Sequence, residues 1–441
     1  MRRHLRLPSL AIVAVLLVAA CSSTTASSAP SAAGSVAASA PAASQAEASP
    51  SAAPPATTPE PAADCARTDD ASAMQMWERS GGNKGMVDLL VCAWNEANPG
   101  KKINLTYIPH AEMVGKIAQG IASGDVPDLM GMDLIYAPQF ENANQLTDVT
   151  DQISAWPELK TASPGHMTVA TFNGRLFGVP LYADVSALFY NKTLFKQAGL
   201  DPNKPPTSLP QLREYADKIT ALGGDIKGYY LPGNCAGCNI FTVGPLMWAS
   251  GATIEAGKCG DEPLVGDGVK QVLQFARDIV KAGDVPDSAR SETGDTFAEQ
   301  FGTGKIGMMG TGNFNIVLAR DQMKGHEFDF GISLLPGMND GSSASFIGGD
   351  IVVIPKGSKR VDDAVAFEKF LLSDNTQIEV YAKNLNLTTR SDMADNKYFK
   401  AEPLVQDVAK ALAVGRTPYT LTFFEQINSP QGPWLQMLQR A

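Results

Sequence analysis

The feature that most constrains the fold of this chain is an alternation of strand-like and helix-like segments at the start of its body. Residues 73–77, 102–108 and 127–133 each predict a strand, with clear alternation of apolar side chains over 102–108, whereas residues 85–97 and 111–122 are predicted helices. Units of strand, helix and strand place parallel strands in one sheet with helices on its faces. The sequence therefore predicts an α/β fold with mostly parallel sheets.

The body of the chain is too long for a single core. From Cys65 to Ala441 it has about 377 residues, and chains above roughly 250–300 residues usually divide into two compact parts. Beyond Val179-Pro180 the pattern resumes with new elements. We expect strands at 186–190, 228–231, 305–309 and 347–354, a hairpin at 252–265, and helices at 191–199, 208–222, 241–249, 266–282, 292–302, 361–373, 374–384, 402–413 and 430–440.

Two α/β lobes place a ligand in the cleft between them, at the carboxyl ends of the strands. The chain is expected to cross between lobes near 179–181, near 346–349 and near 390, and three crossings make a hinge that suits closure around a ligand. The first lobe is then residues 65–180 plus 349–391, and the second is 181–348 plus 392–441.

The first 64 residues predict export and anchoring. Arg2, Arg3 and Arg6 precede an apolar run from Leu10 to Ala20, which is typical of a signal peptide at 1–20 and too short to span a bilayer comfortably. Val18-Ala19-Ala20-Cys21 resembles a bacterial lipobox, which would leave a lipid on Cys21; a plain signal peptide with an incidental cysteine is the alternative. We expect the protein at the extracellular face of the bacterial cytoplasmic membrane.

Residues 21–64 are almost entirely Ser, Ala, Pro and Thr. Such a segment has too little apolar surface to offset its ordering entropy, so it predicts a disordered linker. A flexible linker of this length holds its cargo on the order of 35–40 Å from the anchor.

Charge and cysteine content narrow the function classes. A formal net charge of −10 argues against nucleic acid as the main partner. Five cysteines follow Cys21, and disulfides are expected outside the cytosol. A bridge between Cys65 and Cys92 would pin the start of the fold, while the pairing among Cys235, Cys238 and Cys259 stays open. Cys235-Ala-Gly-Cys238 is expected in a Gly-rich loop, which argues against redox catalysis.

Four segments together resemble one family. They are VPLYADVSALFYNKTLFKQAGLD from Val179, SGDVPDLMGMD from Ser123, FAEQFGTGKIGMMGTGNF from Phe297, and GGDIVVIPKGSKRVDDAVAFEKFLLSDNTQ from Gly348. In this order they resemble the extracellular carbohydrate-binding proteins of ABC importers, the maltose-binding-protein-like lipoproteins. The resemblance implies a two-lobed periplasmic-binding-protein-like fold with a three-segment hinge. It also implies a monomer that delivers a sugar to a membrane permease.

Two departures from the family pattern concern the ligand. Phe314 stands where the family usually has tryptophan, and Thr388-Thr389-Arg390 replaces a Pro-containing turn. Both leave the identity of the sugar open. By the same resemblance, Asp184 accepts sugar hydroxyl hydrogens, and Asn313-Phe314 lies where the family has a stacking residue.

A sugar site needs aromatic plates with carboxylate, amide and guanidinium groups between them. Residues of these types follow the predicted strands or lie at the predicted crossings. The candidate binding set is Trp77, Glu78, Arg79, Asp133, Tyr136, Tyr182, Asp184, Phe241, Trp248, Asn313, Phe314, Asp350 and Arg390.

Several candidates also have structural interpretations. Phe241 and Trp248 are seven residues apart on one predicted helix, so both face the cleft or both face the core. Tyr136 alternatively packs its own helix, and Glu78 with Arg79 alternatively forms a solvated surface pair. Gly348-Gly349 is interpreted as a source of backbone freedom at the hinge rather than as a ligand contact.

Other motifs in the sequence lie in the wrong structural context for the sites that they resemble. Residues 302–307 fit GxGxxG, yet they follow a predicted helix and lead into a strand, the reverse of a dinucleotide site. His110, His166 and His326 lack metal-ligand spacing, and neither a catalytic triad order nor a nucleophile elbow is present. We therefore expect no cofactor, no metal and no enzymatic activity.

Three rival functions remain open at this point. The first is the same fold with a non-sugar ligand, such as a glycerophosphodiester, an amino compound or a peptide. An anionic ligand would need a cluster of basic residues in the cleft, and Arg79 and Arg390 provide few positive charges. A secreted glycan hydrolase needs two carboxylates roughly 5–10 Å apart, for which Asp133, Asp184 and Asp350 are candidates. An adhesion lipoprotein would not close on any small ligand.

Overall fold

The structure, a computed structural model, describes residues 61–80, 83–254, 264–294 and 296–440. The predicted signal peptide, Cys21, Cys259 and most of the predicted linker lie outside the described residues. Ala62, near the start of the described chain, is buried against the hydrophobic core that contains β1 and α1 residues such as Met74 and Trp94. Among the described residues no helix has the length and apolar character needed to span a membrane.

The predicted strand–helix alternation of the first lobe is confirmed. Strand β1 (Met74–Arg79) lies between β2 (Ile103–Ile108) and β3 (Leu129–Asp133) and pairs with both in parallel. Helices α1 (Lys84–Ala97) and α2 (His110–Ser123) connect them. A disulfide between Cys65 and Cys92 ties the start of the body to α1.

The first lobe is completed by short helices, one hairpin and a returning helix. In its core, the Trp94 ring meets those of Phe367 and Phe370 edge-on, each with centroids 5.4 Å away. The elements are a 3₁₀ turn at Leu134–Tyr136, α3 (Ala137–Asn142), α4 (Thr150–Ile153), a 3₁₀ turn at Pro157–Lys160, α5 (Pro164–Val169), β4 (Thr171–Phe172), β5 (Arg175–Leu176), α12 (Val361–Leu372), a π-helix at Thr376–Tyr381 and a 3₁₀ turn at Ala382–Asn384.

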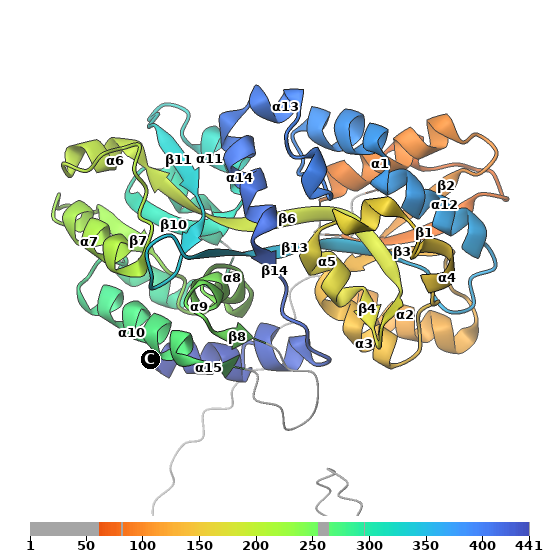
Figure 1. The fold of residues 1–441 in the computed structure, drawn as a ribbon, viewed down its shortest axis with the longest axis horizontal. Helices are drawn as coiled ribbons and strands as arrows, with labels where there is room; N and C mark the ends of the chain where they lie inside the picture. Colours follow the sequence, from red (N-terminus) through yellow and green to blue (C-terminus); the bar gives the residue numbers. More distant parts are fainter. Residues whose placement is uncertain (1–60, 81–82, 255–263, 295, 441) are drawn as a thin grey trace, which may run out of the picture. The chain divides into compact units, whose positions relative to one another are not determined.

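Two long antiparallel strands join the lobes. Strands β6 (Gly178–Asn191) and β13 (Ser343–Val353) lie in the middle of the order β2-β1-β3-β13-β6-β10-β7 and run through both lobes (Figure 1). Their pairing shifts where Asp350 faces Tyr182 and Ile351 faces Pro180, so Leu181 is left over as a bulge. The first two predicted crossings fall in these strands.

The second lobe follows the predicted pattern with two corrections. The expected helix at 241–249 is two helices, α8 (Ala236–Thr242) and α9 (Gly244–Ala249), and the expected helix at 292–302 contains only short 3₁₀ turns at Phe297–Glu299 and Phe301–Thr303. The other elements are α6 (Lys192–Gln197), α7 (Leu209–Thr220), β7 (Lys227–Tyr230), β8 (Thr253–Ile254), β9 (Leu264–Val265), α10 (Asp267–Lys281), a 3₁₀ turn at Asp287–Ser291, β10 (Ile306–Gly312), α11 (Asn315–Gln322), β11 (Phe330–Ser333) and β12 (Leu335–Pro336).

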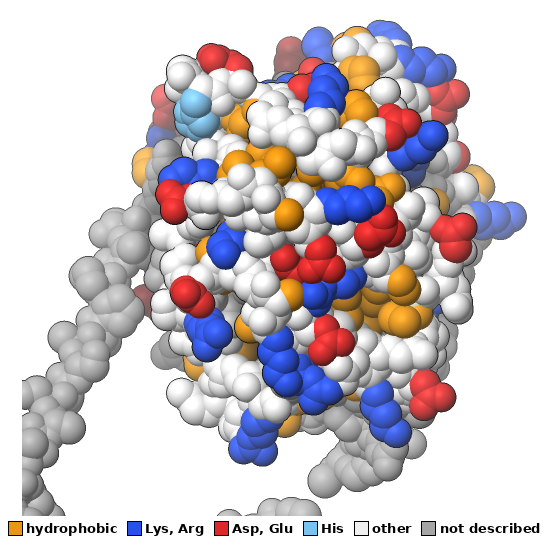
Figure 2. Space-filling view, turned by 90° about the vertical axis from the view of Figure 1, so that its left-hand side faces the viewer, with side chains coloured by type: hydrophobic (Ala, Val, Ile, Leu, Met, Phe, Trp, Pro, Cys, Tyr) orange, Lys and Arg blue, Asp and Glu red, His pale blue; other side chains and the backbone are white. Residues whose placement is uncertain are grey.

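Charges are mixed on the exposed surface of this lobe. On the face shown in Figure 2, Lys and Arg side chains are interspersed with Asp and Glu side chains. This face therefore carries no broad field of one sign, such as the basic stripe that is typical of nucleic-acid binding.

The C-terminal segment adds a crossing that was not predicted. After a 3₁₀ turn at Ser391–Met393, α13 (Lys397–Lys400) and α14 (Pro403–Ala413) lead to β14 (Gly415–Arg416), which pairs with β13. The chain then returns to the first lobe, where Tyr419 lies near Glu141 and the Asn428 side chain meets Tyr136. A π-helix (Phe424–Asn428) lies at this return, and α15 (Pro433–Arg440) then packs against α8 in the second lobe.

We expect Gly349→Ala to lower the free energy of unfolding by about 3 kcal/mol or more. Gly349 has φ +105°, and a Cβ atom there would lie 2.2 Å from the Tyr182 carbonyl oxygen. Gly341 also has positive φ, +75°, but open space around it, so Gly341→Ala is the control and should cost about 1 kcal/mol. Urea denaturation of both variants measures this, and equal losses would contradict it.

Candidate functional site

A cavity of about 290 Å³ lies where the two lobes meet, and we call it the interlobe cavity. Arg79 and Asp133 reach it from the carboxyl ends of β1 and β3, and Asp184 reaches it from β6. The complete lining is Arg79, Asp133, Ile135, Asp184, Gly237, Cys238, Ile240, Phe241, Phe297, Phe314, Phe346, Gly348, Gly349, Phe423 and Asn428. Both lobes and the C-terminal segment therefore contribute to one site.

Arg79 is held by a buried hydrogen-bond network. Its Nε lies 2.9 Å from each carboxylate oxygen of Asp350, and its Nη2 donates to the Tyr182 hydroxyl at 3.1 Å. That hydroxyl donates to Asp350 Oδ1 at 3.0 Å, and Asp133 Oδ2 lies 3.7 Å from Arg79 Nη2. Burial works to raise the pKa of Asp350, but the guanidinium charge and these hydrogen bonds hold it below its usual range. Arg79 is thus already paired.

Glu78 lies beneath this network and does not line the cavity. It is only 1% exposed, so the interpretation as a solvated surface pair was wrong. Its carboxyl group fills the space over Gly131, where a Cβ atom would lie 1.7 Å from Glu78 Oε2. Burial and the neighbouring Asp350 carboxylate raise the pKa of Glu78 well above its ordinary value, which favours the protonated, neutral form of Glu78.

Asp184 is the carboxylate that remains available. It lies opposite Gly348, where a Cβ atom would come within 2.4 Å of Asp184 Oδ1. Burial raises the pKa of Asp184 to about 7. The positive charge of Arg79 lowers this pKa, and the negative charges of Asp133 and Asp350 raise it by smaller amounts. Among the described residues the Asp184 carboxyl group has no hydrogen-bond or ion-pair partner, so its oxygens can accept from a ligand.

Aromatic rings form one wall of the cavity. The Phe241 ring centroid lies 6.1 Å from that of Phe314 and 5.4 Å from that of Phe346. Phe314 is 48% exposed although it is large and apolar. Phe297 and Phe423 add two more rings. An exposed ring beside a carboxylate is the arrangement that binds a flat apolar face bordered by hydroxyl groups.

Two predicted aromatic candidates lie away from the cavity lining. Trp77 packs under α2 with Lys116 Nζ 4.8 Å from its ring. Trp248 is buried and stacks on Phe346 at 6.0 Å. The interpretation that placed Phe241 and Trp248 on one face of one helix was wrong, because the helix breaks at Val243.

The remaining candidates act within the protein framework. Tyr182 and Asp350 hold Arg79, and Tyr136 meets the Asn428 side chain beside the cavity. Asn313 Oδ1 accepts from the Val185 backbone N–H at 2.9 Å, which fixes the turn before α11. Arg390 is mostly buried, forms ion pairs with Asp374 and Asp392, and is not part of the cavity lining.

The sequence prediction missed several lining residues. Phe346 immediately precedes the Ile347-Gly348-Gly349 crossing, a position that was a usable signal. Phe423 and Asn428 come from the unpredicted return of the C-terminal segment. The expectation of a loop at Cys235-Ala-Gly-Cys238 was wrong, because Cys235 caps α8 and is disulfide-bonded to Cys238 at the cavity edge.

In the part of the chain that the structure describes, no three His, Cys, Asp or Glu side chains are grouped as metal ligands would be.

Comparison with known proteins gives one family. The family model for bacterial extracellular solute-binding proteins matches residues 90–407. The sn-glycerol-3-phosphate-binding periplasmic protein UgpB of Escherichia coli O1:K1 is 25% identical over 379 residues, which is 81% of this chain and 84% of the relative.

Two solved structures share the fold. The cyclic alpha-maltosyl-1,6-maltose binding protein from Arthrobacter globiformis has a TM-score of 0.69 at 22% identity, covering 83% of this chain and 96% of its own. The sugar-binding protein MalE from Xanthomonas citri has a TM-score of 0.69 at 20% identity, covering 83% of this chain and 95% of its own. The predicted two-lobed α/β fold is therefore confirmed.

Proposed function

The chain belongs to the family of bacterial extracellular solute-binding proteins, and on that premise we propose that it captures a neutral carbohydrate in the interlobe cavity for an ABC importer. Phe241 and Phe314 offer faces for the apolar C–H surface of a sugar ring, and Asp133 and Asp184 offer acceptors for its hydroxyl groups. Binding energy would drive closure about β6 and β13 without covalent chemistry.

The observation that carries this proposal is that the positive charge of Arg79 is already paired with carboxylates of the protein. Arg79 is the only cationic side chain in the described lining, and Asp350 and Asp133 already neutralise it. A phosphate would enter a cavity whose one cation is already neutralised and which holds a further carboxyl group, Asp184, and this disfavours an anionic solute. A hydroxyl-rich neutral ligand meets no such penalty.

The second candidate is a phosphorylated glycerol compound, because the relative UgpB is named for sn-glycerol-3-phosphate. A tryptophan fluorescence screen of the full chain with mono- and oligosaccharides, beside sn-glycerol-3-phosphate, separates the two. We expect a saturable response to at least one neutral sugar and none to the phosphate. Silence across all sugars and polyols, or a response to the phosphate alone, would overturn the proposal. Release of reducing ends from an oligosaccharide would favour the hydrolase alternative.

We expect Asp184→Ala to lower the affinity for the identified sugar at least tenfold, about 1.4 kcal/mol. Because the pKa of Asp184 is about 7, the ionised acceptor form grows as pH rises from 6 to 8. Wild-type affinity should therefore rise over this range by up to about tenfold, whereas the affinity of the variant should stay flat. Isothermal titration at both pH values measures this, with the exposed Asp225→Ala as control. Unchanged binding in Asp184→Ala would assign Asp184 to structure instead.

Anchoring and delivery complete the proposal. A lipid on Cys21 and a flexible linker at 21–64 would hold the protein as a monomer at the outer face of the cytoplasmic membrane, beside its permease. Detergent-phase partitioning of cells expressing the Cys21→Ser variant tests the anchor, and a variant that still partitions with lipid would refute it.

A further inference from the structure

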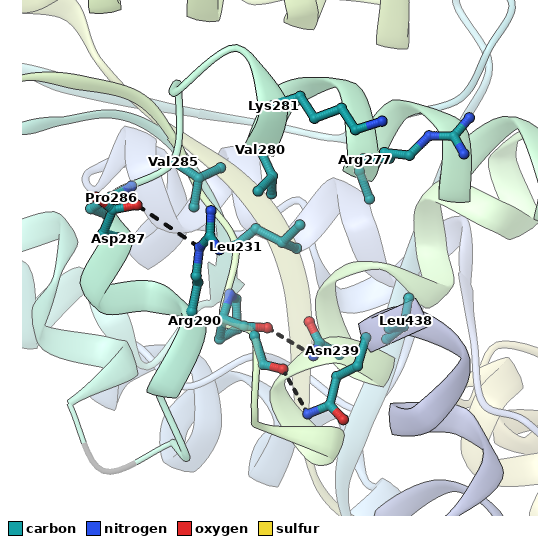
Figure 3. Close-up of a pocket in the computed structure, with 14 residues that line it drawn as sticks. Leu231, Asn239, Arg277, Val280, Lys281, Val285, Pro286, Asp287, Arg290 and Leu438 are labelled. Carbon is teal, nitrogen blue, oxygen red and sulfur yellow. Dashed lines mark hydrogen bonds and ion pairs between the residues drawn. The ribbon is translucent and has the colours of Figure 1, made fainter. Parts of the chain in front are cut away.

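A second cavity of about 480 Å³ lies within the second lobe, and we call it the α10–α15 cavity (Figure 3). Its lining comes from the segment after β7, from α8, from α10, from the loop that follows α10, and from α15. None of its lining residues belongs to the interlobe cavity. Its volume lies within the range of small-molecule sites.

One buried polar group in this lining lacks a partner. Asn239 is 2% exposed, and its Nδ2 donates to the Pro232 carbonyl oxygen at 2.9 Å. A flipped amide would set oxygen against oxygen, so the orientation is fixed. Asn239 Oδ1 has no hydrogen-bond partner among the described residues. Figure 3 shows this oxygen on the side of the amide that faces Leu231 across the cavity. A buried acceptor left unpaired destabilises the fold, and a hydrogen bond from a ligand hydroxyl would offset this loss.

The rest of the lining is apolar inside and cationic at its rim. Leu231, Val280, Val285 and Leu438 supply the apolar walls. Arg277, Lys281 and Arg290 bring three positive charges against the single carboxylate of Asp287. Arg290 Nε lies 3.9 Å from Asp287 Oδ1, and both side chains are largely exposed, so this pair leaves the Arg290 charge available to a ligand.

We propose that the α10–α15 cavity binds a small organic acid with an apolar ring or short chain and a hydroxyl group at the end opposite its carboxylate. The hydroxyl donates to Asn239 Oδ1, the apolar part lies between Leu231, Val280 and Leu438, and the carboxylate faces Arg290. This site is independent of sugar capture. It does share helix α8, which presents Cys238 and Phe241 to the interlobe cavity and Asn239 to this one.

Isothermal titration with 4-hydroxyphenylacetate tests the site on the full chain. We expect saturable one-to-one binding. Phenylacetate lacks the hydroxyl donor and 4-hydroxyphenylethanol lacks the carboxylate, so each should bind at least fivefold more weakly. Failure of all three compounds to bind, or equal binding of all three, would overturn the proposal.

Variants locate the bound probe. Val280→Trp fills the cavity and Arg290→Glu reverses an exposed rim charge without disturbing the core, and each should weaken binding of 4-hydroxyphenylacetate at least tenfold. Asp184→Ala, which alters only the interlobe cavity, should leave this binding unchanged. Thermal melting of each variant checks the fold. Loss of probe binding in Asp184→Ala with retention in Arg290→Glu would place the probe in the interlobe cavity and contradict the inference. Sugar binding by wild type is scored separately, so failure of either proposal leaves the other standing.

Discussion

Replacing Arg79 by methionine is expected to lower the free energy of unfolding at pH 7 by about 3–5 kcal/mol. The change removes the cation from Asp350, which is fully buried, and leaves that carboxylate with two neutral partners, the Tyr182 hydroxyl and the protonated Glu78 carboxyl group. An uncompensated buried charge is among the most costly defects a core can hold. Urea denaturation at pH 7 measures the loss.

The pH dependence and a double variant test the cause of this loss. Asp350 has a depressed pKa when Arg79 is present, so the pair contributes stability above the ordinary carboxyl pKa and loses it as pH falls through the lower folded value. The deficit of Arg79→Met should therefore shrink towards acid pH. Adding Asp350→Asn should recover part of the loss. The exposed pair of Lys305 and Asp225 is the control, and Lys305→Met should cost less than about 1 kcal/mol. An Arg79→Met loss as small as the control would show that Asp350 tolerates burial alone.

Replacing Glu141 by glutamine is expected to remove a large pH dependence of stability. Glu141 is 3% exposed, and neither carboxyl oxygen has a hydrogen-bond partner among the described residues. Burial raises its pKa to about 8 from an ordinary 4.5. A raised acid pKa favours folding fully below pH 4.5, and this contribution is lost as pH rises towards 8. Wild-type stability should fall by about 1.4 kcal/mol per pH unit on this account, about 5 kcal/mol in total.

The measured quantity is the difference in unfolding free energy between Glu141→Gln and wild type at pH 5, 6.5 and 8. As pH rises, the variant should become more stable relative to wild type, whatever the difference between them at pH 5. Other buried acids such as Glu368 titrate in both proteins, so their effects cancel in this difference. Glu214→Gln is the control, because Glu214 is exposed and pairs with Lys218 at the surface. A difference that stays constant with pH would mean that water or a conformational change solvates Glu141.

Local pattern predicted most of the fold because each element of the first lobe carries its own periodicity. The pattern failed where tertiary contacts override it. From the sequence, Val179-Pro180 separates the elements before it from the strand predicted at 186–190, yet β6 runs through this dipeptide. The bulge at Leu181 accommodates the proline within the pairing of β6 with β13, and the Tyr381 hydroxyl donates to the Leu181 carbonyl oxygen. The helix expected at 241–249 broke where Gly244-Pro245 begins a new first turn.

Only part of the candidate site was predicted, because some of its residues are placed by local sequence pattern and others by contacts between distant segments. Arg79 and Asp133 follow from strand ends, a position that the sequence displays directly, whereas Asp184 follows from its place just after the first predicted crossing. Phe423 and Asn428 depend on a C-terminal return that no local signal marks, and Trp248 was misjudged because ring type does not reveal which side of a helix faces the core.

The central claim, that the interlobe cavity takes a neutral hydroxyl-rich solute, is tested most directly by native mass spectrometry of the full chain purified from its own host. The proposed function predicts a bound mass that is released on denaturation and that matches a sugar built from hexose or pentose units without phosphorus. A retained phosphate ester, amino compound or peptide would contradict it.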